Sequence, residues 1–230
     1  MEHTPERPLR VAILISGRGS NMRALAELAR AETLPVEICA VLSNRADAAG
    51  LDWARAQGLP AEVLPHRDFA SREAFDAALG ARLEALAPDY ILLAGFMRVL
   101  GDDFVRRFDG RIINIHPSLL PVFPGLHTHE QALAQGVQWH GCTVHFVTPV
   151  LDHGPIIAQG AIPVHHDDTA DTLAARLLPV EHQVYGQVLR WLAQGRVTLQ
   201  DDGRVRVAGQ AHRAWTGSGA YTEQDCHERE

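Results

Sequence analysis

Short apolar runs alternate with amphipathic segments along the first half of the chain, and this alternation constrains the fold more than any other feature. Residues 10–15 form a β-branched apolar run, and residues 22–31, after a glycine-containing loop, carry apolar side chains at helical spacing. The same strand-then-helix order returns until an apolar run at residues 89–96. Because strands that alternate with helices pair in parallel, this order predicts an α/β fold with a mostly parallel twisted sheet flanked by helices.

The second half of the chain continues with further strands and one long helix. An amphipathic segment over 169–193 contains Pro179, which predicts a kink or a break in that helix. Residues 196–210 have the pattern of a hairpin that turns at Asp-Asp-Gly. The expected strands are 10–15, 36–43, 61–65, 89–96, 111–116, 142–147 and 155–164, and the expected helices are 22–31, 46–58, 71–87, 128–135 and 169–193.

The composition is that of an ordinary globular chain. Of its 230 residues, 46% are hydrophobic and 21% are charged, which excludes a wholly disordered chain and a disulfide-stapled miniature fold. No internal repeat or flexible linker divides the sequence. We therefore expect a single domain over 1–209, ordered from about residue 9, and a flexible C-terminal tail over 210–230.

The charged residues restrict both partners and chemistry. A formal net charge of −7 argues against nucleic acid and anionic membranes as partners. All 21 basic residues are Arg, which excludes a Schiff-base lysine, a pyridoxal phosphate enzyme and the lysine of a P-loop. The 3 Cys lie far apart, and the polar N-terminus lacks the apolar core of a signal peptide. We expect a cytoplasmic protein.

The loop Ser16-Gly-Arg-Gly-Ser-Asn21 joins the first strand to the first helix. Backbone N–H groups at such a helix start favour a phosphate or carboxylate. Met22 occupies the third glycine position of a dinucleotide fingerprint, so a single phosphate fits better than a pyrophosphate. The alternative is a plain glycine turn with Ser20 as a helix cap.

A second polar constellation lies in the run Arg111-Ile-Ile-Asn-Ile-His-Pro. Asn114 and His116 are two apart in a strand, so they share one side at the strand's C-terminal end, where ligands bind in open α/β sheets. An amide and an imidazole there can donate to a developing oxyanion, although a buried polar pair is the alternative. Asp152 follows 36 residues after His116, and a carboxylate meeting that imidazole would favour its charged form. The alternative is an aspartate that only serves its turn.

Other catalytic chemistries find less support. The chain has 13 His, and its densest groups, His127 with His129 and His165 with His166, lack the spacing of zinc ligands. We therefore expect no metal. No G-x-S-x-G elbow occurs, and Cys39 and Cys142 fall in predicted strands. Direct transfer between two bound ligands, one of them phosphorylated, remains.

Six segments, in order from about residue 10 to 200, carry a family resemblance: ILISGRGSN, VLSNRADAAGL, LLAGFMRVL, INIHPSLLPVFPGLHTH, GCTVHFVTPVLDHGPII and VEHQVYGQVLRW. They resemble the formyltransferase superfamily and, within it, the folate-dependent phosphoribosylglycinamide formyltransferases. The resemblance implies a single-domain Rossmann-like formyltransferase fold. It also implies transfer of the formyl group of 10-formyltetrahydrofolate, a co-substrate, to the glycine amine of 5'-phosphoribosylglycinamide in de novo purine biosynthesis.

The family's functional residues fall on identifiable positions here. The resemblance implies catalytic roles for Asn114, His116 and Asp152, ribonucleotide binding by Gly19, Ser20, Asn21 and Glu181, and folate binding by Arg72, Met97, Arg98, Val99, Leu100 and Asn114. On residue type alone, Arg72 could be merely solvated, and Met97 and Leu100 could be core residues. Two positions depart from the family: Leu178 stands where some relatives carry a polar residue that helps bind phosphate, and Gly186 replaces the usual proline.

Other functions remain open at this point. A formyltetrahydrofolate hydrolase and methionyl-tRNA formyltransferase share the fold but normally carry an extra domain. A non-catalytic nucleotide-binding module would leave the three polar residues unexplained, and a nicotinamide oxidoreductase is disfavoured by Met22. The expected partners are small-molecule substrates, with the chain as a monomer or homodimer.

Overall fold

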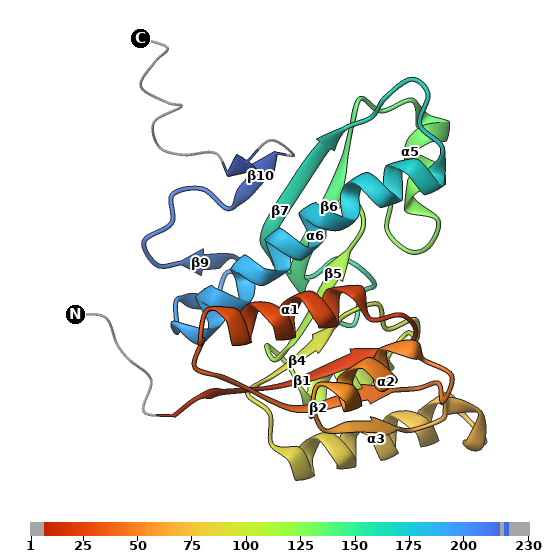
Figure 1. Cartoon of the computed structure of the whole chain (residues 1–230), viewed down its shortest axis with the longest axis vertical. Helices are drawn as coiled ribbons and strands as arrows, with labels where there is room; N and C mark the ends of the chain where they lie inside the picture. The colour runs from red at the N-terminus through yellow and green to blue at the C-terminus, as the bar shows by residue number, and fades with distance from the viewer. Residues whose placement is uncertain (1–6, 217–218, 221–230) are drawn as a thin grey trace.

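The computed structural model describes residues 7–216 and 219–220, and a sheet runs through the whole of this part (Figure 1). Its nine described strands lie in the order β11-β10-β7-β6-β5-β4-β1-β2-β3. The strands are β1 (Leu9–Ile15), β2 (Val36–Ser43), β3 (Ala61–Val63), β4 (Tyr90–Leu93), β5 (Ile112–His116), β6 (Trp139–Phe146), β7 (Ile156–Pro163), β10 (Ala214–Thr216) and β11 (Gly219–Ala220).

The first five strands pair in parallel, as the alternation of strands and helices predicts. Strand β6 then pairs antiparallel with both β5 and β7, while β10 lies parallel to β7. The predicted α/β fold with a mostly parallel sheet flanked by helices is confirmed.

Helices cover both faces of the sheet. They are α1 (Ser20–Ala31), α2 (Ala49–Ala56), α3 (Arg72–Leu86), α4 (Asp102–Arg107), α5 (Thr128–Gln135) and α6 (Ala170–Ala193). Alternate residues of β1 separate two cores: Ile13 packs with α1, α2 and α6, and Leu14 packs with α3 and α4. The parallel strands are therefore buried on both faces. A ligand site can then form only from the loops at their C-terminal ends.

The long helix α6 is continuous through Pro179, so of the predicted kink or break the break is wrong. Pro179 cannot donate to the carbonyl of Ala175, but both residues are exposed and water can hydrate that carbonyl. On the opposite face, Leu177 and Val180 are buried against the sheet, and this packing holds the helix together.

The C-terminal part shows the predicted hairpin and two unexpected strands, β10 and β11. The predicted hairpin forms from β8 (Val197–Leu199) and β9 (Val205–Val207), which pair antiparallel. Beyond residue 209, where we expected a flexible tail, β10 joins the sheet because Trp215 is buried against Trp191 of α6. The remainder of the expected tail, 217–218 and 221–230, lies outside the described residues. No helix in the described part is long and apolar enough to span a membrane.

Candidate active site

The predicted polar pair lies at the end of β5, facing the antiparallel neighbour β6. Asn114 is directly opposite His145, and His116 is directly opposite Thr143. Directly opposed residues point to the same face, so these four side chains share one surface of the sheet. His116 and His145 are buried, whereas Asn114 is partly open to solvent.

Asp152 reaches this surface from the loop between β6 and β7. Its Oδ2 lies 3.5 Å from His116 Nδ1, and both side chains are buried. The same oxygen accepts a hydrogen bond of 2.8 Å from the backbone N–H of Gly125. Asp152 has a left-handed backbone with φ of 52°, which turns its side chain into the site. The three residues with implied catalytic roles therefore lie together.

Both ring nitrogens of His116 face acceptors. Nε2 lies 2.9 Å from the carbonyl oxygen of Phe123, and Nδ1 faces Asp152. An N–H on either ring nitrogen therefore has an oxygen atom beside it as an acceptor.

His145 belongs to the same cluster, although we did not single it out from the sequence. Its Nδ1 donates to the carbonyl of Phe146 at 2.9 Å, and burial lowers the pKa of the ring, so Nε2 carries a lone pair. That nitrogen lies 3.4 Å from Asn114 Nδ2 and accepts from the amide. His145 therefore orients Asn114. The available signal was its position two residues after Thr143 in an apolar strand.

Two histidines, His129 of α5 and His140 of β6, join these elements. His129 Nδ1 lies 3.0 Å from His140 Nε2, and burial lowers the pKa of both rings, that of His140 to about 4. Because burial disfavours the charged form of each ring, both rings are neutral, with one donating and the other accepting. Among the described residues no group of three or more His, Cys, Asp or Glu could hold a metal ion. The imidazoles of this pair instead bind each other.

The glycine loop leads directly into α1, which begins at Ser20. Gly19 is the N-cap residue and has a φ of 69°, so the alternative of Ser20 as the cap is wrong. Asn21 Nδ2 donates to Glu181 Oε2 of α6 at 2.8 Å. Burial raises the pKa of Glu181, and the hydrogen bond from Asn21 opposes this. The four residues assigned to the ribonucleotide thus meet where α1 and α6 approach each other.

Gly186 lies where α6 packs against α1. At Gly186 of α6, an added Cβ would lie 2.9 Å from Leu28 Cδ2 of α1. A side chain at position 186 would require the Leu28 side chain of α1 to shift.

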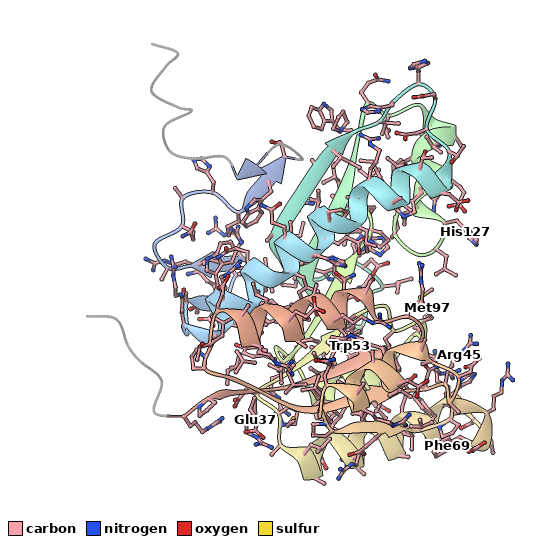
Figure 2. All side chains as sticks on the ribbon, viewed as in Figure 1. Glu37, Arg45, Trp53, Phe69, Met97 and His127 are labelled. Carbon is pink, nitrogen blue, oxygen red and sulfur yellow. The ribbon has the colours of Figure 1, made fainter. Side chains whose placement is uncertain are left out.

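The segment after β4 borders the glycine loop. Ser16 Oγ accepts from the backbone N–H of Met97 at 2.8 Å, which ties the two loops together. Met97 is 67% exposed and is therefore not a core residue. Leu100 is buried, as a core residue would be. Figure 2 shows Met97 and His127 on the same side of the molecule.

The two arginines with implied folate contacts lie near this segment. The Arg98 guanidinium stacks on the ring of Phe75 with its Cζ 5.1 Å from the ring centroid, and its buried Nε has no protein partner. Arg72, the first residue of α3, is half-exposed and 3.7 Å from Glu73. Arg98 is therefore fixed by packing, while Arg72 is held only by a surface ion pair.

Comparisons of the sequence and the fold with known proteins find formyl transferases. Residues 9–189 match the formyl transferase family. The chain is 45% identical over 194 residues to the phosphoribosylglycinamide formyltransferase of Escherichia coli K12, a match that covers 84% of this chain and 92% of that protein. Glycinamide ribonucleotide transformylase 1 from Symbiobacterium toebii superposes with a TM-score of 0.84 at 45% identity, covering 88% of this chain and 95% of that one. A formyltetrahydrofolate deformylase from Pseudomonas syringae superposes with a TM-score of 0.80 at 28% identity. The match covers 88% of this chain and 66% of that one.

Proposed function

Because the chain belongs to the formyl transferase family, we propose that it transfers the formyl group of 10-formyltetrahydrofolate to the glycine amine of 5'-phosphoribosylglycinamide, a step of de novo purine biosynthesis. The observation that carries the proposal is the meeting of Asn114, His116 and Asp152 at the C-terminal end of β5. It combines amide, imidazole and carboxylate groups in the way that acyl transfer to an amine requires.

The reaction is an attack of the amine on the formyl carbon. A new C–N bond forms, the bond from that carbon to N10 of the folate breaks, one proton leaves the amine and one arrives at N10. Asn114 Nδ2 and the charged His116 stabilise the oxyanion of the tetrahedral intermediate. Asp152 faces the His116 ring at 3.5 Å, accepts the amine's proton through water and returns a proton to N10 by the same route.

In the described arrangement, His116 Nε2 is engaged by the Phe123 carbonyl. Direct donation from this nitrogen to the oxyanion therefore requires that hydrogen bond to open. Asn114 meets no such obstacle, because its NH2 group has two N–H donors and His145, at 3.4 Å, takes only one of them. Asn114 is thus the principal oxyanion donor of the proposed mechanism, and His116 contributes its positive charge.

The ribonucleotide binds between α1 and α6. Its phosphate lies at the N-terminus of α1, where the backbone N–H groups after Gly19 and the helix dipole favour an anion. Glu181, held by Asn21, accepts from the hydroxyl groups of the ribose. With Leu178 apolar, backbone donors carry more of the phosphate binding than they would beside a polar side chain.

The folate binds along residues 97–100, where Met97 and Val99 present exposed apolar side chains. Arg98 is fixed on Phe75, and Arg72 pairs with the glutamate tail. A cytoplasmic location and a monomeric or dimeric state stay predictions.

The test is a spectrophotometric assay of deformylation of a 10-formyl folate analogue, with and without the ribonucleotide. We expect deformylation that depends on the ribonucleotide and is lost in His116→Asn. Deformylation without the amine acceptor would instead support a hydrolase, the activity of the similar Pseudomonas protein. Binding of both ligands without turnover would support a non-catalytic module.

A further inference from the structure

A row of side chains crosses the sheet beside the candidate catalytic residues. His116 on β5 is directly opposite Thr143 on β6, and Thr143 is directly opposite Gln159 on β7. Opposed residues project to the same face, so the hydroxyl and the amide extend the catalytic surface away from His116. Neither belongs to the residues with implied roles.

The hydroxyl of Thr143 is completely buried and its hydrogen-bonding capacity is filled. It donates to Ser118 O at 2.7 Å, and it accepts from Leu120 N and from Gln159 Nε2, each at 3.0 Å. A hydroxyl has one donor and two acceptor positions, so no further bond is possible. The Gln159 amide also donates to Leu120 O at 3.0 Å. Three backbone groups of one loop are therefore held by two side chains, which we call the loop clamp.

The loop held by the clamp supplies two backbone groups that contact His116 and Asp152. The carbonyl of Phe123 contacts His116 Nε2 at 2.9 Å, and the N–H of Gly125 donates to Asp152 Oδ2 at 2.8 Å. Between clamp and site, Ser118 Oγ donates to Val122 O at 2.6 Å and closes the loop on itself. Displacement at Ser118 would thus be transmitted to both polar groups.

Arg213, the residue before β10, braces the far end of the row. The backbone N–H of Gln159 donates to Arg213 O at 3.0 Å, and the Arg213 guanidinium donates to Ile156 O and Ile157 O. Gln159 is therefore fixed on both edges of its strand, so its amide approaches Leu120 from a rigid position.

We propose that Thr143 and Gln159 are positioning residues for the proposed formyl transfer. The clamp holds the loop so that the Phe123 carbonyl stays on His116 and the Gly125 amide stays on Asp152. This proposal rests on the proposed function. Its physical basis is that a catalytic group misplaced by about 1 Å can lose on the order of 100-fold in rate.

Thr143→Val tests the clamp with little change in shape, because it replaces the hydroxyl by a methyl group. We expect kcat to fall by about 10- to 100-fold. The KM for the ribonucleotide stays near that of the wild type, because Asn21 and Glu181 are outside the loop. Amide exchange accelerates at Leu120 and Gly125, and the pH profile of kcat changes with the contacts of His116. Thr143→Ser, which keeps the hydroxyl, restores all of these values.

Two further variants keep the test decisive. Val205→Ala in β9 removes buried apolar surface outside the loop, so it serves as a stability control that leaves kcat unchanged. Gln159→Leu removes the donors to Leu120 and Thr143 and gives the same kinetic pattern should Thr143→Val fail to fold. The proposal is overturned if loop amides exchange faster while kcat stays within about twofold, or if Val205→Ala, at an equal loss of Tm, lowers kcat as much.

Failure of the proposed function gives a different result. Wild-type protein that shows no ribonucleotide-dependent transfer would contradict that function. In that case the exchange rates of Leu120 and Gly125 alone decide whether the clamp holds the loop, and unchanged rates in Thr143→Val overturn it.

Discussion

Asn21 and Glu181 are 160 positions apart in the sequence, and the amide of the first donates to the carboxyl of the second at 2.8 Å. The contact joins the first turn of α1 to the middle of α6, beside the glycine loop. Asn21 Oδ1 is buried without a protein partner. Because burial raises the pKa of Glu181, this site stores an electrostatic cost that a bound ligand with hydroxyl donors would relieve.

Replacing Glu181 by Gln removes this cost while keeping an oxygen that accepts from Asn21. A carboxyl whose folded pKa is raised binds more protons in the folded state, so its contribution to stability declines as pH rises through and above its unfolded pKa. We expect the Tm of Glu181→Gln, relative to that of the wild type, to increase as pH rises from about 4 to 7. Differential scanning fluorimetry across this range measures it.

Glu32→Gln provides the control of opposite sign. Arg190 lowers the pKa of Glu32, so that carboxylate stabilises the folded state increasingly as pH rises. The Tm of Glu32→Gln should fall relative to the wild type over the same interval. If the two variants changed in the same direction, burial of Glu181 would not control its ionisation. The Glu181→Gln variant should also raise the KM for the ribonucleotide, because it loses the carboxylate acceptor.

The His129–His140 pair predicts a loss of stability in acid. Burial lowers the pKa of His140 from 6.5 to about 4, so the unfolded state binds more protons than the folded state between these values. Stability therefore falls as pH drops below about 6.5, by on the order of 3 kcal/mol once pH reaches 4, at 1.36 kcal/mol per pH unit. Thermal unfolding measured between pH 7 and 4 should show this slope.

In His140→Gln the slope should become shallower, since the buried titrating ring is gone. His166→Gln, at a side chain that is 97% exposed, should leave the slope unchanged. Equal slopes in His140→Gln and the wild type would mean that other groups cause the acid sensitivity.

Much of the fold followed from local periodicity. The β-branched runs and the helical spacing predicted β1 to β7 and five of the helices, because each element buries its own repeating face. The six-residue α4 is too short to show a period. Strand β10 was missed because its three residues show no apolar run, and Trp215 is held in the strand by its contact with Trp191. Such tertiary stabilisation leaves no local signal.

The candidate site was likewise predictable only where it depends on local sequence. The two-residue spacing of Asn114 and His116 within a strand predicted their shared face. His145 depended on the register of β6 against β5, which a single sequence does not reveal. The close spacing of His127 and His129 raised the possibility of a metal site. In the structure, His129 instead contacts His140, 11 positions away. The sequence alone therefore predicted positions within one helix or strand, but not contacts between residues of different elements.

Gly19→Ala should damage the ribonucleotide site. Gly19 has a φ of 69°, and an added Cβ would lie 3.0 Å from Met22 Cε and 3.3 Å from Gly50 Cα. The left-handed conformation costs an L-residue about 1–2 kcal/mol, and relief of the contacts would rotate the first N–H groups of α1. We expect a lower Tm and a KM for the ribonucleotide raised by about tenfold, a change that corresponds to 1.4 kcal/mol of binding free energy.

Gly17→Ala is the matched control in the same loop, because an added Cβ there would meet no atom within 4 Å and the φ of Gly17 is not positive. Steady-state kinetics with varied ribonucleotide compares the two variants. An equal rise in KM for both would show that the loop tolerates no side chain for reasons other than the conformation of Gly19.

Asn114→Ala tests the oxyanion donor that the geometry favours. Removal of one such donor typically costs on the order of 10²- to 10³-fold in kcat, and the partly open position of Asn114 means that folding should survive. His116→Asn should abolish turnover, and Asp152→Asn should be nearly as damaging, because the carboxylate faces the His116 ring at 3.5 Å. Single-turnover transfer at saturating substrates, with circular dichroism to check folding, measures all three. The neighbouring His153→Gln, at an exposed ring, should keep wild-type turnover. Near-normal turnover in His116→Asn would remove the imidazolium from the mechanism and leave Asn114 as the sole oxyanion stabiliser.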